Sequence, residues 1–132
     1  HDIDFYQKLE ASGTKVQHIC YEPEDVDLLS ELLKESKLPK SGTWCMFVIG
    51  HYSGRLSVPE NISKFISKLK KNDIDADWAV CAFGKEETTC LETAIKLGGK
   101  IRVGFENSLL MPDGTIAPNN ETKVKAANAL FE

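Results

Sequence analysis

The chain has 132 residues, 42% of them hydrophobic, and a formal net charge of −4 at pH 7. This length is enough for one domain with a hydrophobic core and too short for two ordinary domains. The mild negative charge offers no basic surface, and no apolar run approaches the roughly 18 residues of a membrane-spanning helix, so we expect no nucleic acid and no membrane as partner. No signal peptide is visible, and we expect a cytoplasmic protein. The start at His1-Asp2, without Met, suggests a piece of a longer chain.

Helical and strand patterns alternate along the sequence. Ile62, Phe65 and Leu69 recur at helical spacing, whereas Trp44–Ile49 is a continuous apolar run typical of a buried strand. Proline at a first turn and glycine after a last turn mark helix ends. In chain order we expect a helix over 3–12, a strand over 16–22, a helix from Pro23, a strand over 44–49, a helix from Pro59, a strand over 77–83, a helix over 86–97, a strand over 101–106 and a last helix through Val124, Ala127 and Leu130.

Four strands that are each followed by a helix predict an α/β fold with a parallel sheet. Two architectures remain open from composition alone: a small doubly wound sheet, and half of an eight-stranded barrel. In both, functional side chains lie at the carboxyl ends of the strands. Three predicted strands end in candidate polar residues, namely Gly50-His51, Gly84-Lys85 and Glu106-Asn107.

The predicted strand over 101–106 gives the strongest indication of a site. Its apolar and polar residues alternate, so Arg102 and Glu106 would share one face with Gly104 between them. If the apolar face packs under helices, the two charges point into the interior of the sheet assembly. Opposite charges are costly there unless they pair, bind a metal or contact a ligand. We therefore expect a functional site, with a purely structural ion pair as the alternative.

The four cysteines do not have the spacing of a metal site. Three lie in predicted strands among apolar neighbours, where a buried reduced thiol is the expected state. We predict buried free thiols at Cys20, Cys45 and Cys81, and no nucleophilic role for Cys81 or Cys90, which have no visible histidine partner.

Several motifs, which together cover nearly the whole chain, are similar to those of one enzyme family. The most specific is the run Gly-Gly-Lys-Ile-Arg-Val-Gly-Phe-Glu-Asn at 98–107. Further matches are Phe-Val-Ile-Gly at 47–50, Gly54, Pro59-Glu-Asn61, Trp78, Gly84, Asp113-Gly114, Ala117 and Asn119-Asn120. These motifs resemble the β-keto acid cleavage enzymes.

The resemblance implies a zinc-dependent TIM barrel of about twice this length. Residues 1–132 would then be a single βα-repeat unit, equivalent to the second half of the barrel, strands five to eight. The first half supplies a His-x-His pair of zinc ligands in the family, and no such motif occurs in this sequence.

The resemblance also implies roles for individual residues. Glu106 matches the carboxylate that completes the zinc site, and Arg102 matches an active-site arginine that handles a carboxylate or an enolate charge. Asn107 stands where many members have an aspartate thought to take part in proton transfer, and an amide cannot act as a general base. The Gly84-Lys85 turn is a candidate for contacting a CoA phosphate through free backbone N–H groups, with an ordinary exposed loop lysine as the alternative.

The sequence departs from the family pattern at two further places. Gln17 and Ile19 fall where acidic residues are common, and His51-Tyr52 stands where small residues are usual. His51 is a candidate ligand or base, with a solvated loop histidine as the alternative.

The implied reaction is an acyl exchange in which a β-keto acid and acetyl-CoA give acetoacetate and the CoA ester of the shortened acid. Zinc would polarise the keto oxygen as a Lewis acid. Because a half barrel leaves one sheet face uncovered, we expect the chain to associate with its missing N-terminal half or a second copy, as a homo-oligomer. The alternative function is a non-catalytic half-barrel or assembly module.

Overall fold

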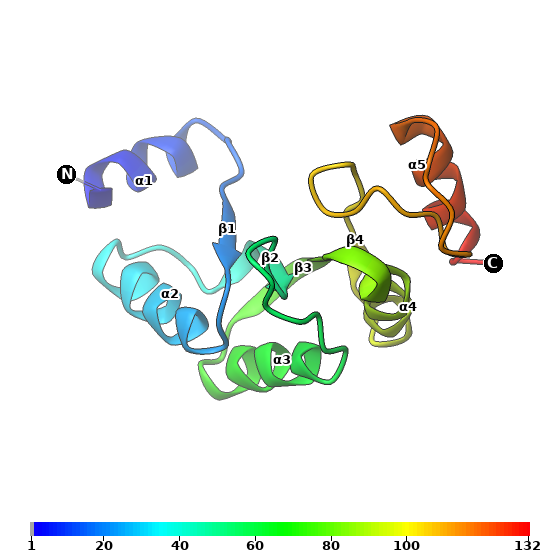
Figure 1. Ribbon diagram of the computed structural model, residues 1–132. Coiled ribbons are helices and arrows are strands. Elements are labelled where there is room, and N and C mark those ends of the chain that lie inside the picture. Colours follow the sequence, from blue (N-terminus) through cyan, green and yellow to red (C-terminus); the bar gives the residue numbers. More distant parts are fainter. Residues whose placement is uncertain (1) are drawn as a thin grey trace.

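The computed structural model describes residues 2–132 and shows a parallel sheet with helices packed against it (Figure 1). The four strands lie in the order β1-β2-β3-β4, and each neighbouring pair is parallel. This confirms the predicted α/β class with alternating βα units and is consistent with part of a TIM barrel. None of the helices within residues 2–132 is both long and apolar enough to cross a membrane. The elements are α1 (Asp2–Ala11), β1 (Gln17–Cys20), α2 (Glu24–Glu35), β2 (Ser41–Ile49), α3 (Asn61–Lys71), β3 (Asp75–Ala82), the 3₁₀ turn η1 (Gly84–Glu86), α4 (Glu87–Lys96), β4 (Lys100–Ile101) and α5 (Asn120–Ala129).

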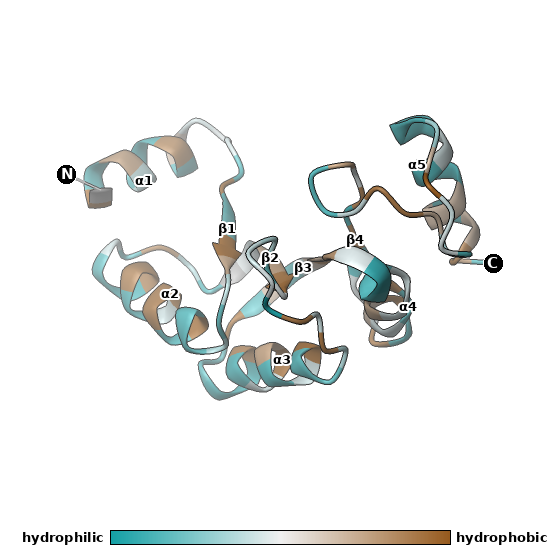
Figure 2. Cartoon of the chain, viewed as in Figure 1, coloured by the Kyte–Doolittle hydropathy of each residue, from teal (hydrophilic) through white to brown (hydrophobic). Residues whose placement is uncertain are grey.

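Helices α2, α3 and α4 contribute to one hydrophobic core on one face of the sheet. Figure 2 shows hydrophobic and hydrophilic bands along α2 and α3, as expected of helices with one buried side. An aromatic stack lies in this core. The ring of Phe47 in β2 is 4.6 Å from that of Phe65 in α3 and 5.7 Å from that of Trp78 in β3, measured between centroids. The stack joins the two central strands to the helix layer.

The opposite face of the sheet carries a second, smaller cluster of Met46, Val48, Ala79 and Cys81. Strand residues alternate between faces, so these side chains point away from the main core. Trp44 and Phe83 pack against the cluster, and no helix within residues 2–132 contributes to it. One face of the sheet is therefore left without a helix layer.

The four cysteines are buried free thiols, as predicted for Cys20, Cys45 and Cys81. Burial raises the pKa of Cys81, while the positive charge of Arg102 opposes this shift. Burial also raises the pKa of Cys90 to about 12. The Cys45 thiol, which is hydrogen-bonded to Cys20 and buried, also has a raised pKa. Cys45, Cys81 and Cys90 are therefore protonated at neutral pH and serve as packing residues.

The start of β4 depends on a residue without a side chain. A Cβ atom at Gly99 would overlap the ring of Trp78. Because the ring of Trp78 is held in the aromatic stack by Phe47, it has little freedom to move away. Glycine at this position lets β4 lie close beside β3.

The fourth strand is shorter than predicted, and the expectation of a strand over 101–106 is wrong. β4 ends at Ile101, and residues 105–107 form a turn. The N–H of Phe105 donates to Oδ1 of Asn120 at 3.0 Å, and the N–H of Asn107 donates to the carbonyl oxygen of Gly104 at 3.0 Å. A side chain at the start of α5 and a local turn thus satisfy backbone groups that a longer strand would have paired.

A buried ion pair connects α5 to α4. Nζ of Lys123 lies 2.8 Å from Oε1 of Glu87, and the two side chains are only 3% and 6% exposed. The ammonium also donates to the carbonyl oxygens of Ser108, at 2.6 Å, and Leu110, at 3.0 Å. Burial raises the pKa of Glu87, and the hydrogen bond and charge of Lys123 oppose this shift. One side chain therefore holds α4, α5 and the loop after β4 together.

Candidate functional site

The carboxyl ends of the strands border two adjoining cavities of about 350 Å³ and 450 Å³. Both volumes lie in the usual range of small-molecule sites, roughly 300–1,000 Å³. The smaller cavity extends over the sheet face that bears Val48, and the larger one extends toward Lys85. The structure thus brings the polar ends of three predicted strands to one edge of the sheet. The cavities share His51, Tyr52, Phe83, Glu106 and Asn107.

The loop after β2 is fixed to the strand ends by one buried serine. Oγ of Ser57 donates to the carbonyl oxygen of Ile49 at 2.7 Å and accepts a hydrogen bond from the N–H of Phe83 at 2.9 Å. Gly50 has a φ of +85°, and a Cβ atom there would collide with Oγ of Ser57. A glycine is therefore needed where the chain leaves β2. This arrangement holds the loop residues that follow Gly50 over the edge of the sheet.

This loop and the neighbouring strand ends build an aromatic wall, which consists of Tyr21, His51, Tyr52 and Phe83. The His51 ring is central to it, with centroid distances of 4.1 Å to Tyr52, 6.2 Å to Phe83 and 6.4 Å to Tyr21. Nδ1 of His51 accepts from the N–H of Ser53 at 3.1 Å and lies 2.6 Å from its Oγ. His51 is therefore half-buried and held within its loop rather than freely solvated.

Arg102 and Glu106 form the polar end of the smaller cavity. Nη2 of Arg102 is 3.2 Å from Oε1 of Glu106, and the side chains are 38% and 71% exposed. Nη2 also lies 3.5 Å from Sγ of Cys81, which places the guanidinium on the uncovered face. The two side chains meet across a turn, not through strand alternation as predicted. An ion pair this exposed contributes only about 0–1 kcal/mol to stability, so stabilisation of the fold does not explain the presence of an arginine at this position.

Buried polar atoms without a partner lie at the same end of the cavity. Within residues 2–132, Oδ1 and Nδ2 of Asn107 and Nε of Arg102 make no hydrogen bond to nitrogen or oxygen, and Asn107 is 5% exposed. In the described part of the chain, the Asn107 side chain interacts only with the weakly polar thiol of Cys81, whose pKa it lowers against the effect of burial. Buried polar groups in native proteins are nearly always paired, and each unpaired one costs about 1–3 kcal/mol. A ligand with carboxylate or carbonyl oxygens would supply the missing acceptors.

The segment that carries Asn107 is held in place from two sides. The carbonyl oxygen of Asn107 accepts from the N–H of Gly84 at 3.2 Å, and that of Ser108 accepts from Lys123. Lys123 and Glu87 thus position the polar end of the cavity without lining it. Sequence reasoning missed both residues, because a lysine and a glutamate on helices are normally exposed.

The Gly84-Lys85 turn lies beside the larger cavity. The N–H of Gly84 donates to Asn107, so it is not free, which corrects that part of the expectation. Lys85 is exposed, and its side chain lines the cavity. Contact between this turn and a CoA phosphate stays a prediction.

Glu106 is the candidate metal ligand of this edge. Zinc sites take at least three protein ligands, and no group of three or more His, Cys, Asp or Glu side chains gathers within residues 2–132. Glu106 presents an exposed carboxylate to both cavities. A role for Glu106 as a metal ligand stays a prediction.

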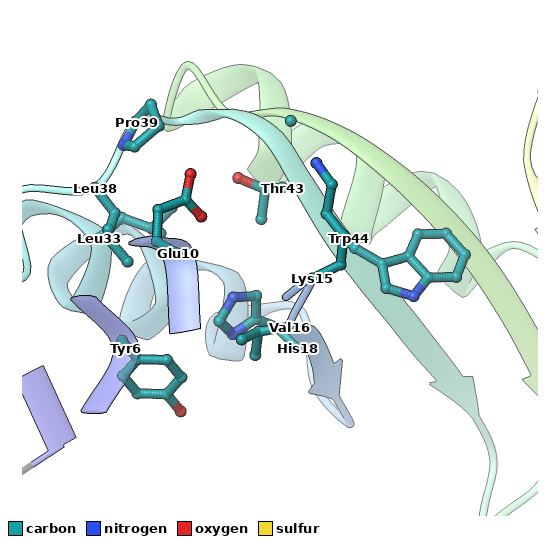
Figure 3. A pocket seen from close by; sticks show the side chains of 11 residues that line it. Tyr6, Glu10, Lys15, Val16, His18, Leu33, Leu38, Pro39, Thr43 and Trp44 are labelled. Carbon is teal, nitrogen blue, oxygen red and sulfur yellow. The ribbon is translucent and has the colours of Figure 1, made fainter. Parts of the chain in front are cut away.

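A third cavity of about 70 Å³ lies at the opposite end of β1 and β2, beside α1 (Figure 3). Glu10, Lys15 and His18 line it, and burial lowers the pKa of His18, whose ring is 5.9 Å from that of Tyr6. None of the unpaired buried side-chain atoms of residues 2–132 belongs to this cavity. The carboxyl edge is therefore the stronger candidate site.

Comparison with known proteins agrees with this arrangement. The sequence model of the family described as beta-keto acid cleavage enzyme matches residues 3–132. The chain is 28% identical over 86 residues to 3-oxoadipate:acetyl-CoA acetyltransferase of Cupriavidus necator, covering 65% of this chain and 30% of that protein. It is 24% identical over 118 residues to 3-keto-5-aminohexanoate cleavage enzyme of Acetoanaerobium sticklandii, covering 89% and 42%. The chain thus spans less than half the length of these relatives. Since the family match extends over almost the whole sequence, the chain belongs to the beta-keto acid cleavage enzyme family.

Proposed function

We propose that this chain forms part of the active site of an enzyme that cleaves a β-keto acid with acetyl-CoA. The products would be acetoacetate and the CoA ester of the shortened acid. Family membership supports this reaction, as do the names of the two relatives, one an acetyl-CoA acetyltransferase and the other a keto acid cleavage enzyme. The observation that carries the proposal is the set of unpaired buried polar atoms of Arg102 and Asn107 at a cavity of small-molecule size.

In this proposal, Arg102 is the catalytic residue that receives negative charge. Its guanidinium binds the substrate carboxylate or the enolate oxygen, because a fixed cation in a partly dry site stabilises developing oxyanions. Asn107 donates through Nδ2 to a substrate oxygen. Glu106 holds Nη2 of Arg102 at 3.2 Å and so limits the orientations of the guanidinium.

Glu106 would also supply one ligand to a zinc ion in the complete enzyme. The remaining ligands would come from the part of the protein that these residues do not include, which we propose to be the N-terminal half of the barrel. A zinc ion bound there would act as a Lewis acid on the keto group.

Replacing Glu106 by Gln is expected to remove zinc from the complete enzyme, since a neutral amide is a much poorer ligand than a carboxylate. Metal analysis of the purified variant measures the result, and Glu121→Gln, on the exposed side of α5, is the control. Residues 1–132 alone should bind zinc weakly or not at all. Stoichiometric zinc with unchanged affinity in the Glu106→Gln enzyme would remove Glu106 from the ligand set.

Asn107 offers a test of proton transfer. Asn107→Asp in the complete enzyme should raise turnover by about tenfold, because the roughly 10²–10⁴-fold contribution of a positioned general base exceeds the loss of the Nδ2 donor. Metal content should stay unchanged. Steady-state kinetics at saturating acetyl-CoA, with metal analysis of the same sample, gives both values. An unchanged or lower rate would show that another group removes the proton, or that residue 107 only shapes the loop.

The larger cavity is the proposed location of CoA. Its wall includes Gly84 and Lys85 at the turn before α4, and the lysine side chain is free to reach a phosphate. The backbone contribution would come from N–H groups after Gly84, whose own N–H is occupied.

The sheet face around Met46 and Cys81 has no helix layer within residues 2–132. We propose that the rest of the barrel or a second copy of the chain covers it. A purely non-catalytic assembly module is not favoured, since such a module gives no reason to keep unpaired polar atoms at a cavity. Acetoacetate formation by the complete protein, with acetyl-CoA and a panel of β-keto acids, tests the proposed function. No product with any acid would reject it.

A further inference from the structure

The smaller cavity has two chemically different ends. One end carries Arg102, Glu106 and Asn107. The other consists of the aromatic wall together with Ile19 and Val48. A ligand that fills the cavity must therefore be polar at one end and matched to an apolar, aromatic surface at the other.

The two charged side chains at the polar end of the cavity already form an ion pair with each other. Apart from His51, its charged lining residues are Arg102 and Glu106, which pair at 3.2 Å at the polar end. At the aromatic wall, Nδ1 of His51 faces Ser53 of its own loop. The wall has no Lys, Arg, Asp or Glu side chain, so a second charge on the ligand would gain no ion pair there and at most a hydrogen bond from His51 or a tyrosine hydroxyl. Loss of water without an opposite charge is costly for an ion.

We propose that the cavity selects β-keto acids with an uncharged, apolar acyl chain, and that Tyr52 is a specificity-determining residue for that chain. This rests on the proposed function. The carboxylate and keto oxygens would lie toward Arg102 and Asn107, and the alkyl or aryl chain would lie on the aromatic wall. Tyr52 is 80% exposed, although its ring packs 4.1 Å from that of His51. A chain lying on this ring would cover apolar area that is now in water.

A matched series of six-carbon acids tests the proposal in the complete enzyme. The series is 3-oxohexanoate, 3-oxoadipate and 5-amino-3-oxohexanoate, which share six carbons and carry beyond the keto group an alkyl chain, a carboxylate or an ammonium group. We expect kcat/KM for 3-oxohexanoate to exceed the other two by roughly tenfold or more. Tyr52→Ser should lower kcat/KM for 3-oxohexanoate by about tenfold and leave the charged acids within about twofold. Phe131→Ser, at another exposed aromatic residue, should change none of the three.

A preference for either charged acid, or an equal loss for all three acids in Tyr52→Ser, would overturn the inference. Turnover of none of the acids would reject the proposed function instead. Binding then decides the inference separately, using hexanoate, adipate and 5-aminohexanoate with the same enzymes by calorimetry. Tightest binding of hexanoate, weakened by Tyr52→Ser alone, supports an apolar-chain site. Equal or tighter binding of the charged acids overturns it.

Discussion

Lys123→Met is expected to lower the free energy of unfolding by about 3–5 kcal/mol. Removing one partner of a buried ion pair leaves the other charge without compensation. Here it leaves Glu87, 6% exposed, and also removes the donor to the carbonyl oxygens of Ser108 and Leu110. Urea unfolding of the wild type and the variant measures the difference.

The chain offers a matched control for this substitution in the same helix. Lys125 pairs with Glu121 at the same 2.8 Å, but both side chains are about three-quarters exposed. Lys125→Met should therefore change stability by less than about 1 kcal/mol. Equal losses of stability in the two variants would show that burial does not increase the contribution of the pair between Lys123 and Glu87.

The loss of stability caused by Lys123→Met should depend on pH. Burial already raises the pKa of Glu87 in the folded protein, and loss of Lys123 removes the influence that opposes this shift. An acid whose folded pKa lies above its unfolded value destabilises the fold increasingly as pH rises above the unfolded value. The stability deficit should thus shrink as pH falls toward the ordinary glutamate range. A deficit that grows on acidification would contradict the assignment of Glu87 as the uncompensated group.

Arg102→Met in the complete enzyme is expected to lower kcat/KM by about 10²–10³-fold, the usual effect of removing one group that stabilises an oxyanion. Arg102→Lys should also be impaired, because a lysine ammonium lacks the planar fork of the guanidinium. Protein stability should change little, since the pair with Glu106 is largely exposed.

Lys100→Met is the control for Arg102, since Lys100 is a basic residue two positions earlier, at the start of β4. Its ammonium pairs with Asp77 at 3.2 Å, and both side chains are exposed. Activity of this variant should stay near the wild-type value. An Arg102→Met enzyme that retains more than about a fifth of wild-type kcat/KM would exclude Arg102 from charge stabilisation in the reaction.

The order and type of the elements could be predicted from the sequence because hydrophobic periodicity reports burial directly. Ile62, Phe65 and Leu69 form the buried stripe of α3 as expected, and Trp44–Ile49 lies within β2. The same reasoning failed at residues 102–106. Their alternation is that of a strand, but the N–H of Phe105 is paired with the Asn120 side chain, 15 residues away. No local pattern contains that contact.

The polar part of the candidate site could be predicted because Arg102, Glu106 and Asn107 are close in sequence and follow a predicted strand. The supporting residues Lys123 and Glu87, which are buried charged side chains, could not be predicted from the sequence. In α5 the pattern favours Val124 as a core residue, yet Val124 is 54% exposed while Lys123 is buried. A lysine becomes buried only because Glu87 and two carbonyl oxygens meet it in space.

The two ends of the cavity have largely separate supports. The aromatic wall depends on Ser57, which joins the ends of β2 and β3, whereas the segment around Asn107 depends on Lys123 and α4. A substitution that reshapes one support leaves most hydrogen bonds of the other intact. During evolution, substitutions in residues 51–57 could therefore change the preference for the acyl chain of the ligand while the segment around Asn107 stays in place. A library confined to that loop is the natural starting point for changing the acid preference that we propose for the complete enzyme.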